Sequence, residues 1–79
     1  MNQYITEFFA HCPTNGVRIK YTLVIDTSEI VMVEGIIDTV NLLDRGYHEA
    51  FADQLLREFG GRQTLTADHH GVRIVTTRG

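Results

Sequence analysis

The sequence predicts an α+β two-layer sandwich, in which an antiparallel sheet carries two helices on one face. Segments with the period-two alternation of half-buried strands occupy both ends of the 79-residue chain, and segments with helical spacing lie between them. Strands in runs with helices inserted between them are typical of an antiparallel sheet covered on one side. We expect a single domain over residues 1–79, because a chain of this length forms one small core.

The first third of the chain predicts strands joined by turns. Residues 4–11 alternate loosely, and Pro13 to Gly16 supplies turn chemistry through a fixed proline torsion and an Asn-Gly pair. Every other residue from Val17 to Ile25 is apolar, which makes this the clearest strand and assigns Ile19 to its core face. The β-branched run from Ile30 to Val33 predicts a third strand.

The middle of the chain predicts two helices. A short helix follows from the spacing of Ile36, Val40 and Leu43. A second helix is predicted to end at Gly60-Gly61, and its core stripe recurs every four residues: Tyr47, Phe51, Leu55 and Phe59.

The end of the chain predicts a hairpin. Residues 64–67 and 72–76 are β-propense and flank the polar stretch Asp68 to Gly71, which supplies a glycine for the loop. The order of elements is therefore strands, helices, strands.

A small core predicts self-association. A single core of this size buries too little apolar surface to give much stability without disulfides, metal or a partner. The face of the sheet that the helices leave open is expected to line a subunit contact or a shared barrel, through Phe9, Val24, Val31, Val33 and Val75.

The composition indicates which partners this protein binds and in which cellular compartment it works. The net charge is −3, with one lysine and six scattered arginines, which argues against nucleic acid as a partner. The single cysteine excludes an internal disulfide, and the first residues, MNQYITEF, resemble neither a signal peptide nor a membrane span. We expect a cytoplasmic protein that does not bind membranes.

Candidate functional groups stand at the predicted ends of elements. Cys12 follows the first strand, Glu34 ends the third strand, and Tyr47-His48-Glu49 begins the second helix. Element ends are where side chains leave the core and where functional groups are usually mounted. Each also has a structural interpretation: Cys12 as a small apolar residue, Glu49 as a first-turn acid, and His48 and Glu34 as ordinary surface groups.

Four segments in order resemble one enzyme family. They are Glu7-Phe8 with Cys12-Pro13 and Gly16, Val33-Glu34, Gly46 to Glu49, and Gly71 to Ile74. Together they are similar to the tunnel-fold 7-cyano-7-deazaguanine reductases, the nitrile reductases of queuosine synthesis. The resemblance implies a tunnel-fold subunit that oligomerises into a barrel and binds a 7-deazaguanine-type base, or another purine- or pterin-like small molecule, at subunit interfaces.

The resemblance also implies roles for the candidate residues. Cys12 would add to a nitrile carbon and form a covalent thioimide, and His48 would pass a proton. Glu49 would bind the substrate by accepting N–H donors from the base, with Glu34 as a second base-recognition residue.

Two departures leave the activity open. The family has an aspartate seven residues after its cysteine, where this chain has Ile19, so that the proton would have to come from a substitute such as His11, Asp26 or His48. The family follows its glutamate with two lysines that bind NADPH, and these are absent after Glu34. The cofactor is therefore not identified, and the chain resembles either an NADPH-dependent reductase or the cofactor-free amidinotransferases of archaeosine synthesis.

Two further interpretations follow from these departures. One is a degenerate member that keeps the oligomeric scaffold and binds a base without chemistry. The other is a different tunnel-fold enzyme, such as a dihydroneopterin aldolase-like protein with Glu49 anchoring a pterin. His69-His70 is similar to the zinc-dependent tunnel-fold GTP cyclohydrolases. We predict no metal site, because adjacent histidines in a hairpin loop do not easily face one ion and there is no second cysteine.

Overall fold

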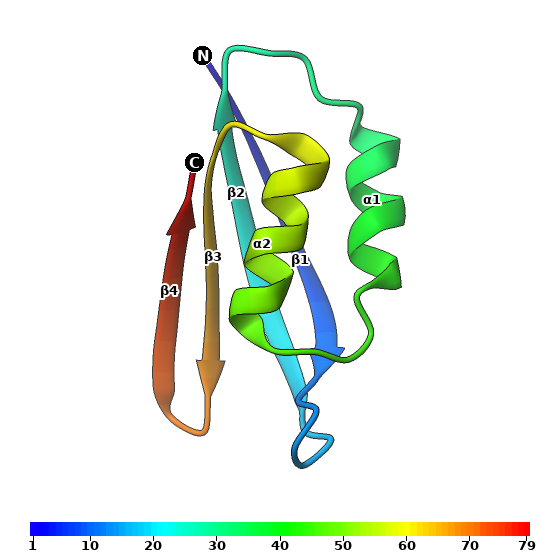
Figure 1. Cartoon of the computed structure of the whole chain (residues 1–79), viewed down its shortest axis with the longest axis vertical. Helices are drawn as coiled ribbons and strands as arrows, with labels where there is room; N and C mark the ends of the chain where they lie inside the picture. The colour runs from blue at the N-terminus through cyan, green and yellow to red at the C-terminus, as the bar shows by residue number, and fades with distance from the viewer.

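Four strands and two helices build one antiparallel sheet with a helical layer. The computed structural model describes all 79 residues. In chain order the elements are β1 (Asn2–His11), β2 (Arg18–Thr27), α1 (Val33–Leu42), α2 (His48–Phe59), β3 (Arg62–His69) and β4 (Val72–Arg78). The strands lie side by side in the order β1-β2-β3-β4, each antiparallel to its neighbour, and the helices lie on one face (Figure 1). The predicted α+β arrangement of a four-stranded antiparallel sheet and two helices is confirmed.

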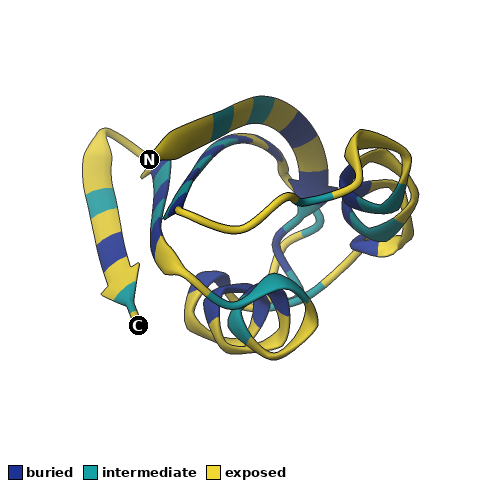
Figure 2. Cartoon of the chain, turned by 90° about the horizontal axis from the view of Figure 1, so that it is seen from above, coloured by how far each residue is buried: buried dark blue, intermediate teal, exposed yellow.

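β2 organises the core because its alternation is the most regular. Its inward side chains include Ile19, Tyr21 and Leu23, each no more than 5% exposed. β1 pairs with β2 along its full length, from Asn2 opposite Thr27 to His11 opposite Arg18. Seen from above in Figure 2, the strands form a curved layer, and α1 and α2 lie on its concave side.

The predicted strand from Ile30 to Val33 is wrong. Val33 begins α1, and the residues before it form an irregular connection. A short apolar run does not distinguish a strand from the start of a helix. Val31 instead packs against the core, and its N–H donates a hydrogen bond to the Tyr4 hydroxyl at 3.1 Å.

α2 buries one face, as predicted, but its stripe begins one residue later than expected. His48, Phe51 and Leu55 are buried, whereas Tyr47 is 62% exposed. Tyr47 precedes the helix with extended backbone angles, φ −80° and ψ 147°, so its side chain does not follow the helical spacing. Gly60 follows the helix with a positive φ, which confirms the predicted stop.

The last hairpin closes with a tighter turn than predicted. β3 and β4 are joined by His70 and Gly71 alone, whose φ angles are 53° and 83°. Two central residues with positive φ are typical of a type I′ turn, which matches the twist of the flanking strands. Glycine adopts this conformation without the steric cost that a side chain brings.

The face of the sheet opposite the helices carries exposed apolar side chains. Ile5, Phe9 and Val75 are 63%, 48% and 58% exposed, and Val24 lies between them, partly buried. The predicted position of Phe9, Val24 and Val75 on this outer face is confirmed, whereas Val31 and Val33 lie outside the sheet. Neither helix is long and apolar enough to span a bilayer.

Candidate functional site

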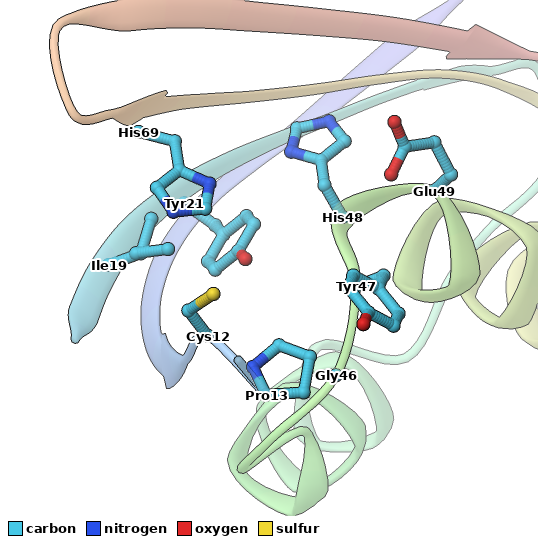
Figure 3. Close-up of a pocket in the computed structure, with 9 residues that line it drawn as sticks. All are labelled: Cys12, Pro13, Ile19, Tyr21, Gly46, Tyr47, His48, Glu49 and His69. Carbon is cyan, nitrogen blue, oxygen red and sulfur yellow. The ribbon is translucent and has the colours of Figure 1, made fainter. Parts of the chain in front are cut away.

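One pocket lies where β1 ends and α2 begins (Figure 3). Its lining combines the end of β1, two residues of β2, the connection into α2, the first turn of α2 and the end of β3. The residues are Cys12, Pro13, Ile19, Tyr21, Gly46, Tyr47, His48, Glu49 and His69. Three of the four predicted site residues, Cys12, His48 and Glu49, therefore come together although they lie far apart in the sequence.

Backbone hydrogen bonds hold the two halves of the pocket together. The N–H of His11 donates to the carbonyl of Asp44 at 2.7 Å, and the N–H of Gly46 donates to the carbonyl of His11 at 3.3 Å. The last residue of β1 is thus bonded to the segment that leads into α2 on both its donor and its acceptor side. This pairing fixes Cys12 opposite the first turn of α2.

Glu34 is not part of this pocket. It lies in the first turn of α1 and is exposed, not at the end of a strand as predicted. The two helices run in opposite directions, so the start of α1 and the start of α2 are at opposite ends of the molecule (Figure 1). Within one chain, Glu34 and Glu49 do not face a common ligand.

The Cys12 thiol is covered but faces the pocket. The residue is 4% exposed, and its Sγ points into the cavity in Figure 3. The backbone N–H of Thr14, and then that of Asn15, lower the pKa of Cys12, and the positive charge of Arg45 adds to this effect against the opposing effect of burial. A thiol with a lowered pKa supplies more of the thiolate, which is the nucleophilic form.

His48 is a buried, neutral side chain with one ring nitrogen unpaired. It is 6% exposed, and its Nε2 lies 3.0 Å from the carbonyl oxygen of Leu65. A carbonyl only accepts, so we assign the proton to Nε2, which leaves Nδ1 as an acceptor. Nδ1 is buried without a partner, and in Figure 3 it lies on the side of the ring toward Tyr21 and His69.

Burial also lowers the pKa of His48, because the charged imidazolium is less well solvated than in water. The imidazole is therefore neutral at neutral pH. In this state it offers a ligand a hydrogen-bond acceptor at Nδ1 and has no proton to give at that atom. The geometry favours recognition of an N–H or O–H group over the proton transfer that the resemblance implies for His48.

Glu49 stands at the rim of the same pocket. It is exposed and lies in the first turn of α2, where the free N–H groups of the helix favour a negative charge. In Figure 3 its carboxylate lies next to the ring of His48. The carboxylate lies on the other side of the ring from Nδ1, so the two adjacent residues offer acceptors that point in different directions.

Sequence reasoning missed Tyr21 and His69. The alternation of β2 assigns Tyr21 to the core, but its hydroxyl reaches the pocket (Figure 3). The available signal was that Tyr21 carries a hydroxyl between the apolar residues Ile19 and Leu23 of the inward stripe of β2. His69 ends β3 on the same face as Leu65 and Ala67, so the period of two also directs it inward.

The position seven residues after Cys12, where the reductases that the sequence resembles have an aspartate, is apolar. Ile19 is 5% exposed and lines the pocket close to Cys12. Of the three substitute proton donors considered, only His48 lines the pocket. Asp26 lies at the other end of β2, where it accepts a hydrogen bond from Gln3 at 2.8 Å, and the Nδ1 of His11 lies 3.3 Å from the carbonyl of Asp44.

The pocket is small and open. Its volume is about 60 Å³, well below the roughly 300–1,000 Å³ of pockets that enclose a small-molecule ligand. A heteroaromatic base is larger, so one chain supplies one wall of such a site and does not enclose the ligand. No group of three or more His, Cys, Asp or Glu side chains is placed to bind a metal ion.

Comparison with known proteins adds no relative. The chain matches no family model, and no curated protein or solved structure is significantly similar to it.

Proposed function

We propose that this protein is a tunnel-fold-like subunit that binds a 7-deazaguanine-type base, and that Cys12 forms a covalent thioimide with a nitrile on that base. The observation that carries the proposal is that Cys12, His48 and Glu49 line one pocket. A thiolate adds to a nitrile carbon more readily than a thiol does, and the turn after Cys12 favours the thiolate.

The acceptors of the pocket suit the edge of such a base. A 7-deazaguanine carries N–H groups on its ring and on its exocyclic amine, and a complementary site needs acceptors. Nδ1 of His48 and the carboxylate of Glu49 are two acceptors on neighbouring residues of the pocket, and the buried Nδ1 has no partner in the chain. Filling a buried unpaired acceptor with a ligand donor removes the cost of leaving it unsatisfied.

Association of several copies would complete the site. β1 is an edge strand, and the backbone of His11 bonds to the segment before α2, so the odd-numbered residues of β1 direct their N–H and C=O groups away from β2. Toward the start of β1, these groups have no strand partner at four residues: Gln3, Ile5, Glu7 and Phe9. An open edge beside an apolar outer face supports a homo-oligomer whose sheets join into a barrel.

The decisive experiment is intact-mass analysis after incubation with 7-cyano-7-deazaguanine. We expect a mass increase of one ligand per chain in the wild type and none in Cys12→Ala. The matched control ligand is 7-deazaguanine, which lacks the nitrile and should raise the melting temperature without forming an adduct. The covalent proposal is wrong if saturating nitrile leaves the wild-type mass unchanged.

Ile19 favours one second candidate, a base-binding protein without chemistry. Ile19 is apolar, so this position beside Cys12 supplies no carboxylic acid to protonate a ligand. This candidate predicts stabilisation by the base that is the same in the wild type and in Cys12→Ser, and any turnover would exclude it. A thermal-shift panel of pterins and deazaguanines, with and without NADPH, would identify the ligand class and the cofactor.

A further inference from the structure

The Tyr21 hydroxyl is a pocket group to which the proposed function assigns no role. The residue is 1% exposed, and its ring is stacked on Phe8 with centroids 5.0 Å apart and an interplanar angle of 10°. Phe51 packs edgewise on the ring at 5.5 Å, and the ring of His48 lies at 5.5 Å from another direction. These contacts hold the ring still, so the hydroxyl has a fixed position.

The hydroxyl points to where a ligand would react. In Figure 3 the hydroxyl faces the interior of the pocket, on the side of Cys12. It makes no hydrogen bond to another group of the chain. Burial raises the pKa of Tyr21, and the negative charges of Cys12 and Glu49 raise it further. The phenol is therefore protonated at neutral pH and is available as a donor to a ligand.

We propose that Tyr21 is the catalytic acid of the site and protonates the nitrogen of a nitrile as Cys12 adds to its carbon. This inference rests on the proposed covalent function and deepens it by naming the proton donor. The Tyr21 hydroxyl would supply the proton that the apolar side chain of Ile19 does not.

The step balances without an oxidant or a reductant. The bond from Sγ of Cys12 to the nitrile carbon forms as one π bond between carbon and nitrogen breaks. The electron pair moves to the nitrogen, which takes the proton of the Tyr21 hydroxyl and gives a neutral thioimide. The phenolate then takes a proton from water at the open mouth of the pocket, so that Tyr21 is restored.

Other polar groups of the pocket suit this role less well. His48 donates its one proton to Leu65 and is an acceptor on the pocket side. Tyr47 is 62% exposed at the rim. The ring of His69 packs against that of His70 in the hairpin turn, with centroids 4.7 Å apart. Tyr21 combines a fixed ring, an unpaired hydroxyl and a place beside the sulfur.

The test compares Tyr21→Phe with the matched control Tyr47→Phe. Each substitution removes one hydroxyl from the pocket lining and keeps the aromatic ring. Two rates are measured by intact mass: alkylation of Cys12 by iodoacetamide, which needs the thiolate alone, and addition of a nitrile, which also needs a proton donor. The nitriles are 7-cyano-7-deazaguanine and the simple thiol-reactive compound 2-cyanopyrimidine.

We expect Tyr21→Phe to slow nitrile addition by about 100-fold, the effect typical of losing one positioned donor or acid. Alkylation should change by less than about threefold, since a volume-conserving change in the core leaves the packing largely intact. Tyr47→Phe should slow nitrile addition far less than Tyr21→Phe does, because the Tyr47 side chain is 62% exposed at the rim. A purely structural role of Tyr21 would lower both rates together.

The outcomes separate this inference from the proposed function. Nitrile addition to Tyr21→Phe at the wild-type rate, or an equal loss in both rates, overturns the role of Tyr21 and leaves the covalent function standing. Wild-type addition of 2-cyanopyrimidine but not of 7-cyano-7-deazaguanine overturns the proposed ligand, and Tyr21 is then judged on 2-cyanopyrimidine. If the wild type adds neither nitrile, both proposals are wrong.

Discussion

Gly46 offers a direct test of how tightly the pocket is packed against the core. It lies in the connection between α1 and α2 and lines the pocket. A Cβ at this position would lie 2.7 Å from Cε1 and 3.1 Å from Cζ of Phe51. Non-bonded carbon atoms prefer a separation of about 3.5–4.0 Å, so Gly46→Ala requires the Phe51 ring to move.

The ring has little room to move. Phe51 is 4% exposed and packs edgewise on Tyr21 at 5.5 Å and on Phe8 at 6.3 Å. Inserting a methyl group into such packing costs about 1–3 kcal/mol, and reduced entropy of the unfolded chain offsets about 0.4–1 kcal/mol of that. We expect a net loss of about 1–2 kcal/mol, which lowers the melting temperature by about 4–16 °C at about 4–8 °C per kcal/mol for a domain of this size.

Gly35→Ala is the matched control and should have the opposite sign. Gly35 lies in α1, and a Cβ there would be 3.8 Å from Cε1 of Phe59, an ordinary contact. Replacing a helix glycine by alanine stabilises by about 0.5–1 kcal/mol, so the melting temperature should rise by a few degrees.

Thermal and urea unfolding followed by circular dichroism measure both changes. Phe51→Leu removes the edge of the ring, so Gly46→Ala should cost less in that background, as a double-mutant cycle would report. The packing argument is wrong if Gly46→Ala is as stable as the wild type, or if its cost is the same with and without the Phe51 ring.

Three further predictions concern the pocket. The lowered pKa of His48 means that the folded chain binds this proton less readily than the unfolded chain, whose histidine titrates near 6.5. Stability should therefore be full above this pH and fall below it, with a shallower fall in His48→Gln. An unchanged pH profile in that variant would contradict the assignment of a lowered pKa to His48. The rate at which iodoacetamide alkylates Cys12 should rise with pH, with a midpoint below the pH of about 8.5 at which a free cysteine titrates, because the N–H groups of Thr14 and Asn15 favour the thiolate. A midpoint at or above that pH would exclude an activated thiol. Ile19→Asp should lower the melting temperature, because it removes a buried apolar side chain worth about 1.5–3 kcal/mol. This variant should also add nitriles faster than Ile19→Asn, whose side chain has the same shape as aspartate but no acid. Equal rates would show that an acid at this position does not act on the nitrile.

Local sequence patterns correctly predicted the strands and helices that are specified by residues close together in the chain. The period of two in β2 identifies Ile19 and Tyr21 as inward, and both are buried. The spacing of Phe51 and Leu55 identifies α2, and Gly60 marks its end. These features depend on residues a few positions apart, so the sequence contains them directly.

Local patterns failed where a distant partner decides the structure. Ile30 to Val33 has strand propensity, but none of these residues pairs with a strand: Val31 packs against the core and Val33 begins α1. Tyr47 fits the apolar spacing of α2 yet precedes the helix with an extended backbone, which leaves its side chain outside.

The sequence by itself determined the type of fold and the residue types available for chemistry: an antiparallel sheet with two helices, one cysteine at a strand end, and a histidine and a glutamate at a helix start. Only the tertiary structure decided which of them meet. It brings Cys12, His48 and Glu49 to one pocket, leaves Glu34 at the other end of the helical layer, and adds the hydroxyl of Tyr21. The physical reason is that strand pairing and helix packing set distances between residues far apart in the chain, and no local periodicity encodes those distances.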